Sequence, residues 1–182
     1  MVWIDMEMTG LDNDNDHILE IAIVVTDQYA DRIFEKTTLY IKHDDDVYEN
    51  ATQWAKENLV DIAYKSKNIG VTYEEASEKL TKFFEKYVHV RKRNSSYIRR
   101  VILCGSTVST DRRILLKYFP HLEKWISHKT IDVSGLMEII KLVRPNIIKF
   151  QPRNTGNHTA MSDILSSINL YKYYVQAIFN DY

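Results

Sequence analysis

The sequence predicts an α/β fold in which a mixed central β-sheet is flanked by α-helices. Strand-like segments follow one another through residues 3–42, and segments with helical periodicity dominate afterwards. One short apolar strand returns between the helices at residues 101–105. Strands that come early, together with a late strand between helices, indicate a sheet with both antiparallel and parallel neighbours, covered by helices.

The length and composition fit a single domain spanning residues 1–182. A chain of 182 residues can bury a substantial core, and no repeat, linker or low-complexity tract divides it. No apolar run has the length of a membrane helix, and strand-like sequence begins at Val2 without a signal segment. A single cysteine, Cys104, excludes an internal disulfide framework. We therefore expect a protein of the cytoplasm or of an organelle matrix, without membrane association.

The formal net charge of −1 argues against a protein that tracks long nucleic acids, because phosphate contacts dominate such binding and require a basic excess. The exception is RKRNSSYIRR (91–100), where five of ten residues are basic. This stretch is either a solvated surface loop or a patch that attracts phosphate.

Three strands are expected at the start of the chain. WIDMEM (3–8) alternates in polarity, and HILEIAIVVTD (17–27) is rich in β-branched residues. The polar, glycine-containing TGLDNDND between them has the composition of a turn. DRIFEKTTLYIK (31–42) is a plausible third strand.

The helices follow. Residues 72–88 repeat apolar side chains at helical spacing, with acids early and lysines late, as the helix dipole favours. The strand VILCG (101–105) leads into STVSTDRRILLKYF (106–119), whose hydroxyl residues can cap a helix. Further helices are predicted over 132–143 and 160–179.

Two acids, Asp5 and Glu7, interrupt the apolar first strand. Alternate residues of a strand share a face, so both carboxylates lie on one side with their Cα atoms about 7 Å apart. Like charges at that distance repel, whereas a bound divalent cation such as Mg²⁺ would hold them together. The alternative is an edge strand with a wet second face. Glu20, an acid among apolar neighbours of the next strand, is either structural or an outer partner of such a site.

Three more residues extend this pattern further along the chain. Asp111 lies on the same helix face as the apolar Ile114 and Leu115, although an acid in a first turn can also simply favour the helix dipole. Asp163 falls outside the polar arc of its helix, where a lone charge needs a partner. His158 precedes that helix in a loop and is free to turn toward the same point, although most single histidines are structural.

Several carboxylates and one imidazole match the requirements of two-metal phosphoryl transfer. Such sites hold two cations roughly 3.5–4 Å apart, one positioning the attacking hydroxide and the other stabilising the leaving oxygen. A neutral histidine near them can accept the proton of water, because its pKa lies close to neutral pH.

WIDMEMTGLD, the acid in GSTVSTDRR, IDVSGL and HTAMSD occur in this order along essentially the whole chain. In these motifs the sequence resembles the oligoribonuclease family of the DEDDh 3′→5′ exonucleases. The resemblance implies an RNase H-like fold, two Mg²⁺ or Mn²⁺ ions, a homodimer, and release of nucleoside 5′-monophosphates from very short RNAs, down to dinucleotides. It assigns His158 as the general base and implies four metal-binding acids: Asp5, Glu7, Asp111 and Asp163.

The resemblance also implies contacts to the substrate. Leu11 matches a leucine that wedges against the terminal base, and Trp54 resembles a tryptophan near the site. Thr107 and Ser134 match hydroxyl residues that help to hold the far phosphate of the substrate. Lys129 stands where the family usually has arginine. Adjacent to it, His128 stands where the family usually has a tyrosine that reaches across the dimer.

Besides His128, three positions depart from the family pattern: Leu59 replaces a histidine, Thr110 a glutamine, and Lys129 an arginine. Lysine cannot form the two-pronged phosphate contact of arginine. The departures leave the catalytic set intact but alter the residues that limit substrate length. Somewhat longer RNA is therefore a possible substrate, with the basic stretch 91–100 as a contact.

Three other interpretations compete with this one. The D-x-E-x-T pattern at Asp5 faintly resembles that of haloacid-dehalogenase-type phosphatases, but it leaves HTAMSD unexplained. A second interpretation is a non-catalytic module of the same fold that binds RNA ends or a protein, which loss of a metal acid would favour; none is lost. The third is a related DEDDh exonuclease that acts on longer RNA or on DNA 3′ ends.

Overall fold

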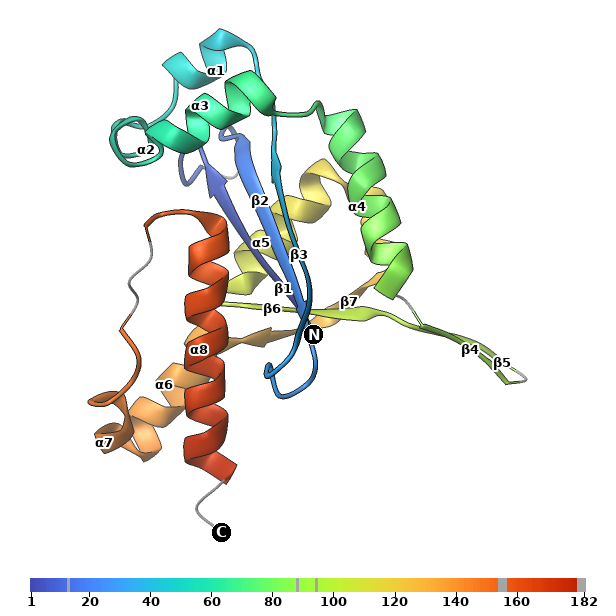
Figure 1. Ribbon diagram of the computed structural model, residues 1–182, viewed down its shortest axis with the longest axis vertical. Coiled ribbons are helices and arrows are strands. Elements are labelled where there is room, and N and C mark those ends of the chain that lie inside the picture. The colour runs from blue at the N-terminus through green and yellow to red at the C-terminus, as the bar shows by residue number, and fades with distance from the viewer. Residues whose placement is uncertain (13, 88, 94, 154–156, 180–182) are drawn as a thin grey trace.

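The computed structural model is built around a five-stranded sheet in the order β3-β2-β1-β6-β7 (Figure 1). The strand β2 (Ile18–Thr26) runs antiparallel to both of its neighbours, β1 (Val2–Met8) and β3 (Ile33–Tyr40). On the other side of β1, β6 (Val101–Gly105) and β7 (Ile126–Asp132) run parallel to it and to each other. The prediction of a mixed central sheet is confirmed.

The structure describes the chain except for residues 13, 88, 94, 154–156 and 180–182, and it describes only the backbone of 89–93, 95–99 and 179. Its helices are α1 (Asp45–Glu49), α2 (Gln53–Asn58), α3 (Val60–Ile69), α4 (Tyr73–Tyr87), α5 (Val108–Tyr118), α6 (Val133–Val143), α7 (Pro145–Ile148) and α8 (Ala160–Phe179), with a 3₁₀ turn at Pro120–Lys124.

Alternation along β1 divides the core between the two faces of the sheet. Val2 and Ile4 pack on one face with apolar residues of α4 and α5, and Met6 and Met8 join them. Trp3 packs on the other face with α8 and α6. The sheet is thus the middle layer between two layers of helices, as expected from the period-two pattern of residues 2–8 (Figure 1).

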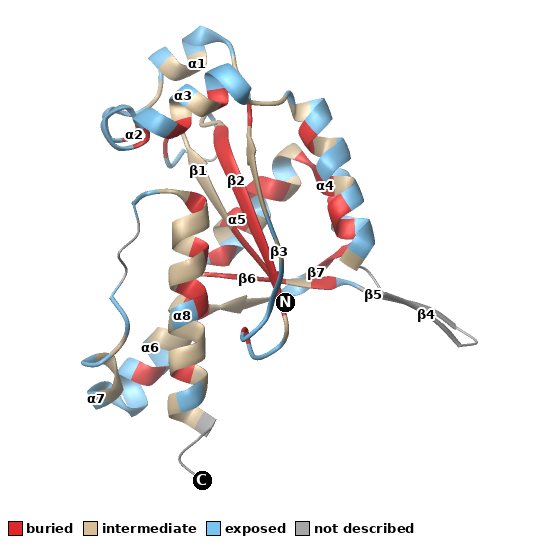
Figure 2. Cartoon of the chain, in the orientation of Figure 1, coloured by how far each residue is buried: buried red, intermediate tan, exposed pale blue. Residues whose placement is uncertain are grey.

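Burial differs sharply between the centre and the outer helices. Every residue of β2 is buried, whereas α1 to α3 and the α6–α7 segment present exposed surfaces (Figure 2). Because β2 lies between β1 and β3 under two helix layers, its nearly continuous apolar sequence has no solvent-facing side. No described helix is both long and apolar enough to span a membrane.

Some elements differ from the prediction. Residues 91–100, expected as a loop or a phosphate patch, lie largely in an antiparallel hairpin of β4 (His89–Arg93) and β5 (Ser95–Arg99), so the loop prediction was wrong. The side chains of 91–99 lie outside the described residues, and the phosphate patch stays a prediction. Other parts of the fold were not predicted: the edge strand β7, the helices α1 to α3, the short α7 and the 3₁₀ turn.

Candidate active site

The first two acids of the site project from β1 onto the face covered by α8. Asp5 is paired in register with Ala22 of β2, and Glu7 with Glu20. Trp3, two residues before Asp5, packs on the same face against α8. The alternation that buries Val2 and Ile4 on one side therefore aims both carboxylates at the helix on the other.

Asp163 completes a group of three carboxylates. It lies in the first turn of α8, which packs against β1 and β2. One carboxylate oxygen each of Asp5, Glu7 and Asp163 lies within 4.8 Å of the other two. Asp5 and Asp163, which are 158 positions apart in the sequence, thus lie close together. All three acids are partly buried.

Asp111 lies beside this group on α5. It is buried, with 9% of its surface exposed. The backbone N–H of Met6, the residue after Asp5, donates a hydrogen bond to the Asp111 carboxylate. After burial, the charge of Asp111 is the next cause that raises the pKa of Asp5. We call Asp5, Glu7, Asp111 and Asp163 the acid centre.

Burial and mutual repulsion disfavour ionisation within the acid centre. Burial is the main cause that raises the pKa of Asp5 to about 9, and the charge of Asp111 is the next. The pKa of Glu7 is raised to about 7, first by burial and then by the charge of Asp163. Burial also raises the pKa of Asp111 to about 7, although backbone hydrogen bonds oppose the shift.

This arrangement fits divalent cations. Ionisation of four neighbouring carboxylates is costly, but it becomes favourable when a hard cation supplies the opposite charge. Mg²⁺ and Mn²⁺ prefer carboxylate oxygen ligands. The group of three carboxylates offers one such set, and Asp111 adds a fourth acid next to Asp5.

His158 lies at the mouth of the acid centre. Together with Asp5 and Asp163 it lines a cavity of about 280 Å³. Its side chain is exposed, and its backbone has φ 51°, a left-handed conformation that non-glycine residues seldom adopt. The imidazole meets the ring of Trp54 edge to face, with 5.5 Å between the centroids. The structure therefore brings His158 to the point predicted from the sequence.

A second cavity, of about 740 Å³, adjoins Glu7 and Asp111. Leu11 and Trp54 line it with 96% and 52% of their surfaces exposed, and Thr110 contributes to its wall. Leu11 lies in the turn after β1, whereas Trp54 lies on α2. Because Trp54 also contacts His158, the two cavities meet at that contact.

Thr107 and Ser134 come together at the ends of two parallel strands. β6 ends at Gly105 and β7 at Asp132, so the residues that follow lie side by side. The Asp132 carboxylate accepts hydrogen bonds from the backbone N–H groups of Thr107 (3.0 Å) and Ser134 (2.9 Å). The two hydroxyl oxygens are 3.3 Å apart.

Other predicted contact residues lie away from the acid centre. His128 and Lys129 are exposed on the edge strand β7 and line neither of the two cavities. We call the six predicted contact residues the substrate rim: Leu11, Trp54, Thr107, His128, Lys129 and Ser134. Leu59, at the position where the family has histidine, is 1% exposed and packs with Leu19 and Ile62. It is a core residue.

Sequence reasoning missed several polar residues of the acid-lined cavity. Ser106, Ser166 and Ser167 line it, and the hydroxyls of Ser106 and Ser167 are 2.8 Å apart. A signal existed, because Ser166, Ser167 and Leu170 follow Asp163 by three, four and seven residues. That spacing describes one face of a helix.

The family model of the RNase T exonucleases matches residues 2–171. The chain belongs to the RNase T exonuclease family. It is 38% identical to an oligoribonuclease of Pseudoalteromonas atlantica over 99% of this chain and 96% of that protein. It is 35% identical to an oligoribonuclease of Chromobacterium violaceum, over 96% of this chain and 92% of the relative. These full-length matches place it in the oligoribonuclease branch.

Solved structures show the same fold. A zinc-bound exonuclease I from E. coli in complex with single-stranded DNA matches 99% of this chain with a TM-score of 0.70 and 16% identity. Another exonuclease I structure matches 97% with a TM-score of 0.68. This chain covers 41% and 40% of those two proteins. The mixed sheet flanked by helices is therefore the RNase H-like fold of the DEDDh exonucleases.

Proposed function

We propose that the chain is a 3′→5′ exoribonuclease that degrades very short RNAs, down to dinucleotides, to nucleoside 5′-monophosphates. The observation that carries the proposal is the convergence of three carboxylates within 4.8 Å, with Asp111 beside Asp5 and His158 at the mouth. The names of the full-length relatives support the same activity.

The acid centre would hold two Mg²⁺ or Mn²⁺ ions. When bound, such ions lower the pKa of water and neutralise charge on the phosphodiester. The four carboxylates fix where this chemistry takes place. His158 lines the same cavity as Asp5 and Asp163, and its imidazole is exposed there. From this place it can accept the proton of the attacking water.

The substrate rim would hold the RNA. Leu11 and Trp54 offer apolar surface beside Glu7, on which the 3′-terminal bases can pack. The adjacent hydroxyls of Thr107 and Ser134 can donate hydrogen bonds to the next phosphate. The one phosphodiester of a dinucleotide is the bond that is cleaved, so the next phosphate is the 5′-terminal phosphate of a 5′-phosphorylated dinucleotide. Few contacts beyond these are needed for such a short substrate.

We propose a homodimer, in which His128 and Lys129 of one subunit would lie at the active site of the other. In one chain they lie away from both cavities, so a role in substrate binding requires that they act on the site of a partner. A set of apolar side chains on α6 and just after α7 supports association: Ile139, Leu142 and Phe150 are 57%, 84% and 78% exposed. We propose the cytoplasm as the place of action, since the lone Cys104 is a free, buried thiol.

A second candidate is exonuclease activity on somewhat longer RNA or on DNA. Leu59 favours it, because a buried leucine offers no contact to the substrate where the family has histidine. Lys129 favours it as well, because lysine cannot form the two hydrogen bonds with which an arginine would hold the terminal phosphate of a very short RNA.

The test is incubation of the purified protein with labelled RNAs of about 2 to 20 nucleotides, and with matching DNAs, in Mg²⁺, Mn²⁺ or chelator. We expect mononucleotide release, fastest from the shortest RNAs and abolished by chelator and by Asp111→Ala. Equal rates for all lengths would favour the second candidate. No mononucleotide from any substrate would refute the exonuclease proposal.

A further inference from the structure

Glu20 is a buried acidic residue that has no role in the proposed reaction. It lies on β2, and only 2% of its surface is exposed. Its partner across the strands is Glu7, a member of the acid centre. Two acids at such a position repel each other, and burial of a carboxylate is itself costly. A specific interaction must therefore keep Glu20 in place.

That interaction is with the first residue of α8. The Glu20 carboxylate accepts a hydrogen bond from the backbone N–H of Ala160 at 2.8 Å, in a buried setting. The first N–H groups of a helix have no partner within it, and they attract negative charge. The first residue of the 20-residue α8 is thus hydrogen-bonded to a side chain of the sheet.

A local cap also starts α8, but it cannot set the position of the helix. The Thr159 hydroxyl accepts a hydrogen bond from the N–H of Ser162 at 3.3 Å, which is the usual N-cap arrangement. This contact lies within the helix end and moves with it. The bond from Ala160 to Glu20, in contrast, joins the helix end to β2 across 140 positions of the chain.

The catalytic groups of this segment lie on both sides of the anchored residue. His158 comes two residues before Ala160, and Asp163 comes three after it. His158 also holds a left-handed backbone conformation, which requires support from its surroundings. The bond to Glu20 lies between them, so it governs where both groups stand relative to Asp5 and Glu7 on the sheet.

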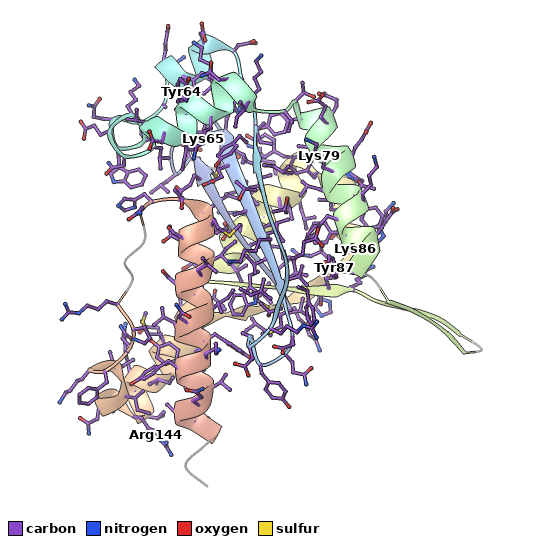
Figure 3. The ribbon with its side chains drawn as sticks, in the orientation of Figure 1. Tyr64, Lys65, Lys79, Lys86, Tyr87 and Arg144 are labelled. Carbon is purple, nitrogen blue, oxygen red and sulfur yellow. The ribbon has the colours of Figure 1, made fainter. Side chains whose placement is uncertain are left out.

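Residues of β3 and α3 also lie close to Glu20. Tyr40 of β3 is its cross-strand partner. Burial raises the pKa of Glu20, and the backbone N–H of Ala160, the Tyr40 phenol and the charge of Lys65 each oppose that shift. The Lys65 ammonium lies 5.4 Å from the centre of the Tyr40 ring. Figure 3 labels Lys65 on α3, above the end of the sheet where β2 begins.

We propose that Glu20 is a positioning residue that locks the start of α8 onto the sheet and thereby sets His158 and Asp163 against Asp5 and Glu7. It is distinct from the group of three carboxylates that can hold a cation, which does not include it. The effect on rate rests on the proposed exonuclease function, whereas the anchoring itself does not.

Three variants test the proposal. Glu20→Ala removes the acceptor, Glu20→Gln keeps an oxygen that can accept from Ala160 while removing the charge, and Glu35→Ala removes an acid of β3 that pairs with Lys86 on the surface. We expect Glu20→Ala to lower kcat on a dinucleotide about 10- to 100-fold with KM changed less than about threefold, because the groups that react shift while Leu11 and Trp54 do not. Glu20→Gln and Glu35→Ala should stay within about threefold of the native kcat.

Amide hydrogen exchange provides a readout that does not depend on nuclease activity. The Ala160 N–H should be protected in the native protein and in Glu20→Gln, and should exchange at least about tenfold faster in Glu20→Ala. Equal protection in all three proteins would overturn the anchoring. Equal loss of kcat in Glu20→Gln and Glu20→Ala would also overturn the proposal, because charge rather than the hydrogen bond would then govern the rate. If the native protein proved inactive, hydrogen exchange would still decide the anchoring.

Discussion

The acid centre and the substrate rim, of which Leu11 and Trp54 line the cavity beside Glu7, are built in opposite ways. The acid centre is set into the interface between the sheet and helices α5 and α8, where burial raises the pKa values of Asp5, Glu7 and Asp111. The substrate rim is formed by side chains of turns, helix starts and an edge strand, all of them exposed except the half-buried Ser134. Packing and charge therefore constrain the residues of the acid centre, whereas packing constrains those of the substrate rim only weakly.

This difference predicts which of the two regions tolerates substitution. A change in the acid centre would leave buried like charges without a cation to balance them. A change in the substrate rim costs little folding free energy, because exposed substitutions usually have small effects. Of the three positions expected to depart from the family pattern, Thr110 lines the cavity beside Glu7 and Lys129 is exposed on β7, whereas Leu59 is a core residue.

The largest effect is expected from Asp5→Asn in the acid centre. The substitution keeps the size of the side chain but removes a ligand, so kcat on a dinucleotide should fall about 10⁴-fold or more. Steady-state release of mononucleotide in Mg²⁺ or Mn²⁺ measures this. Residual activity within about tenfold of native would mean that Asp5 is not part of the cation site.

A smaller effect is expected at the substrate rim. Leu11→Ala removes apolar surface from the cavity beside Glu7, and KM for a dinucleotide should rise about tenfold while kcat changes little. Ile69→Ala is a matched control, because Ile69 is an exposed aliphatic residue at 67% but lies on α3 and lines neither cavity. A fall in kcat without a change in KM for Leu11→Ala would contradict the separation between rim and acid centre.

The smallest effect is expected from Lys129→Arg. Arginine can bind a phosphate through two parallel hydrogen bonds, so the variant should prefer dinucleotides over longer RNAs by about two- to fivefold more than the native protein. The ratio of kcat/KM for RNAs of about two and seven nucleotides measures this preference. An unchanged ratio would show that Lys129 does not contact the substrate.

The sequence predicted the parts of the fold that have a strong period. β1, β2 and α4 have clear alternation or helical spacing, and each is present within one or two residues of the predicted bounds. β7 was missed because SHKTID, at the exposed edge of the sheet, has no apolar alternation. The helices between 45 and 69 were missed because they are short and mostly exposed, so their apolar pattern is weak.

The acid centre was predictable in membership but not in geometry. Asp111 and Asp163 were recognisable as charges on apolar helix faces, since such charges require partners. The contact of His158 with Trp54, and the anchoring of Ala160 by Glu20, depend on how α2 and α8 dock on the sheet. No local pattern in the sequence contains that information.

The raised pKa values also predict how stability depends on pH when no metal is bound. The pKa of Asp5 rises from 3.8 to about 9 on folding, so the folded protein holds a proton that the unfolded chain releases. The stability that this proton contributes is complete below about pH 4 and is lost as pH rises toward about 9. Glu7, with a pKa of about 7, acts in the same direction.

The most direct test is the shift in the unfolding temperature that Mg²⁺ produces at pH 8, compared between the native protein and Asp5→Asn. A ligand that binds only the folded state stabilises it, and the native acid centre is under electrostatic repulsion at this pH. We predict that Mg²⁺ raises the unfolding temperature of the native protein by several degrees, and that of Asp5→Asn by much less. An equal shift in both proteins, or no shift in the native protein, would contradict the account of the acid centre as a cation site.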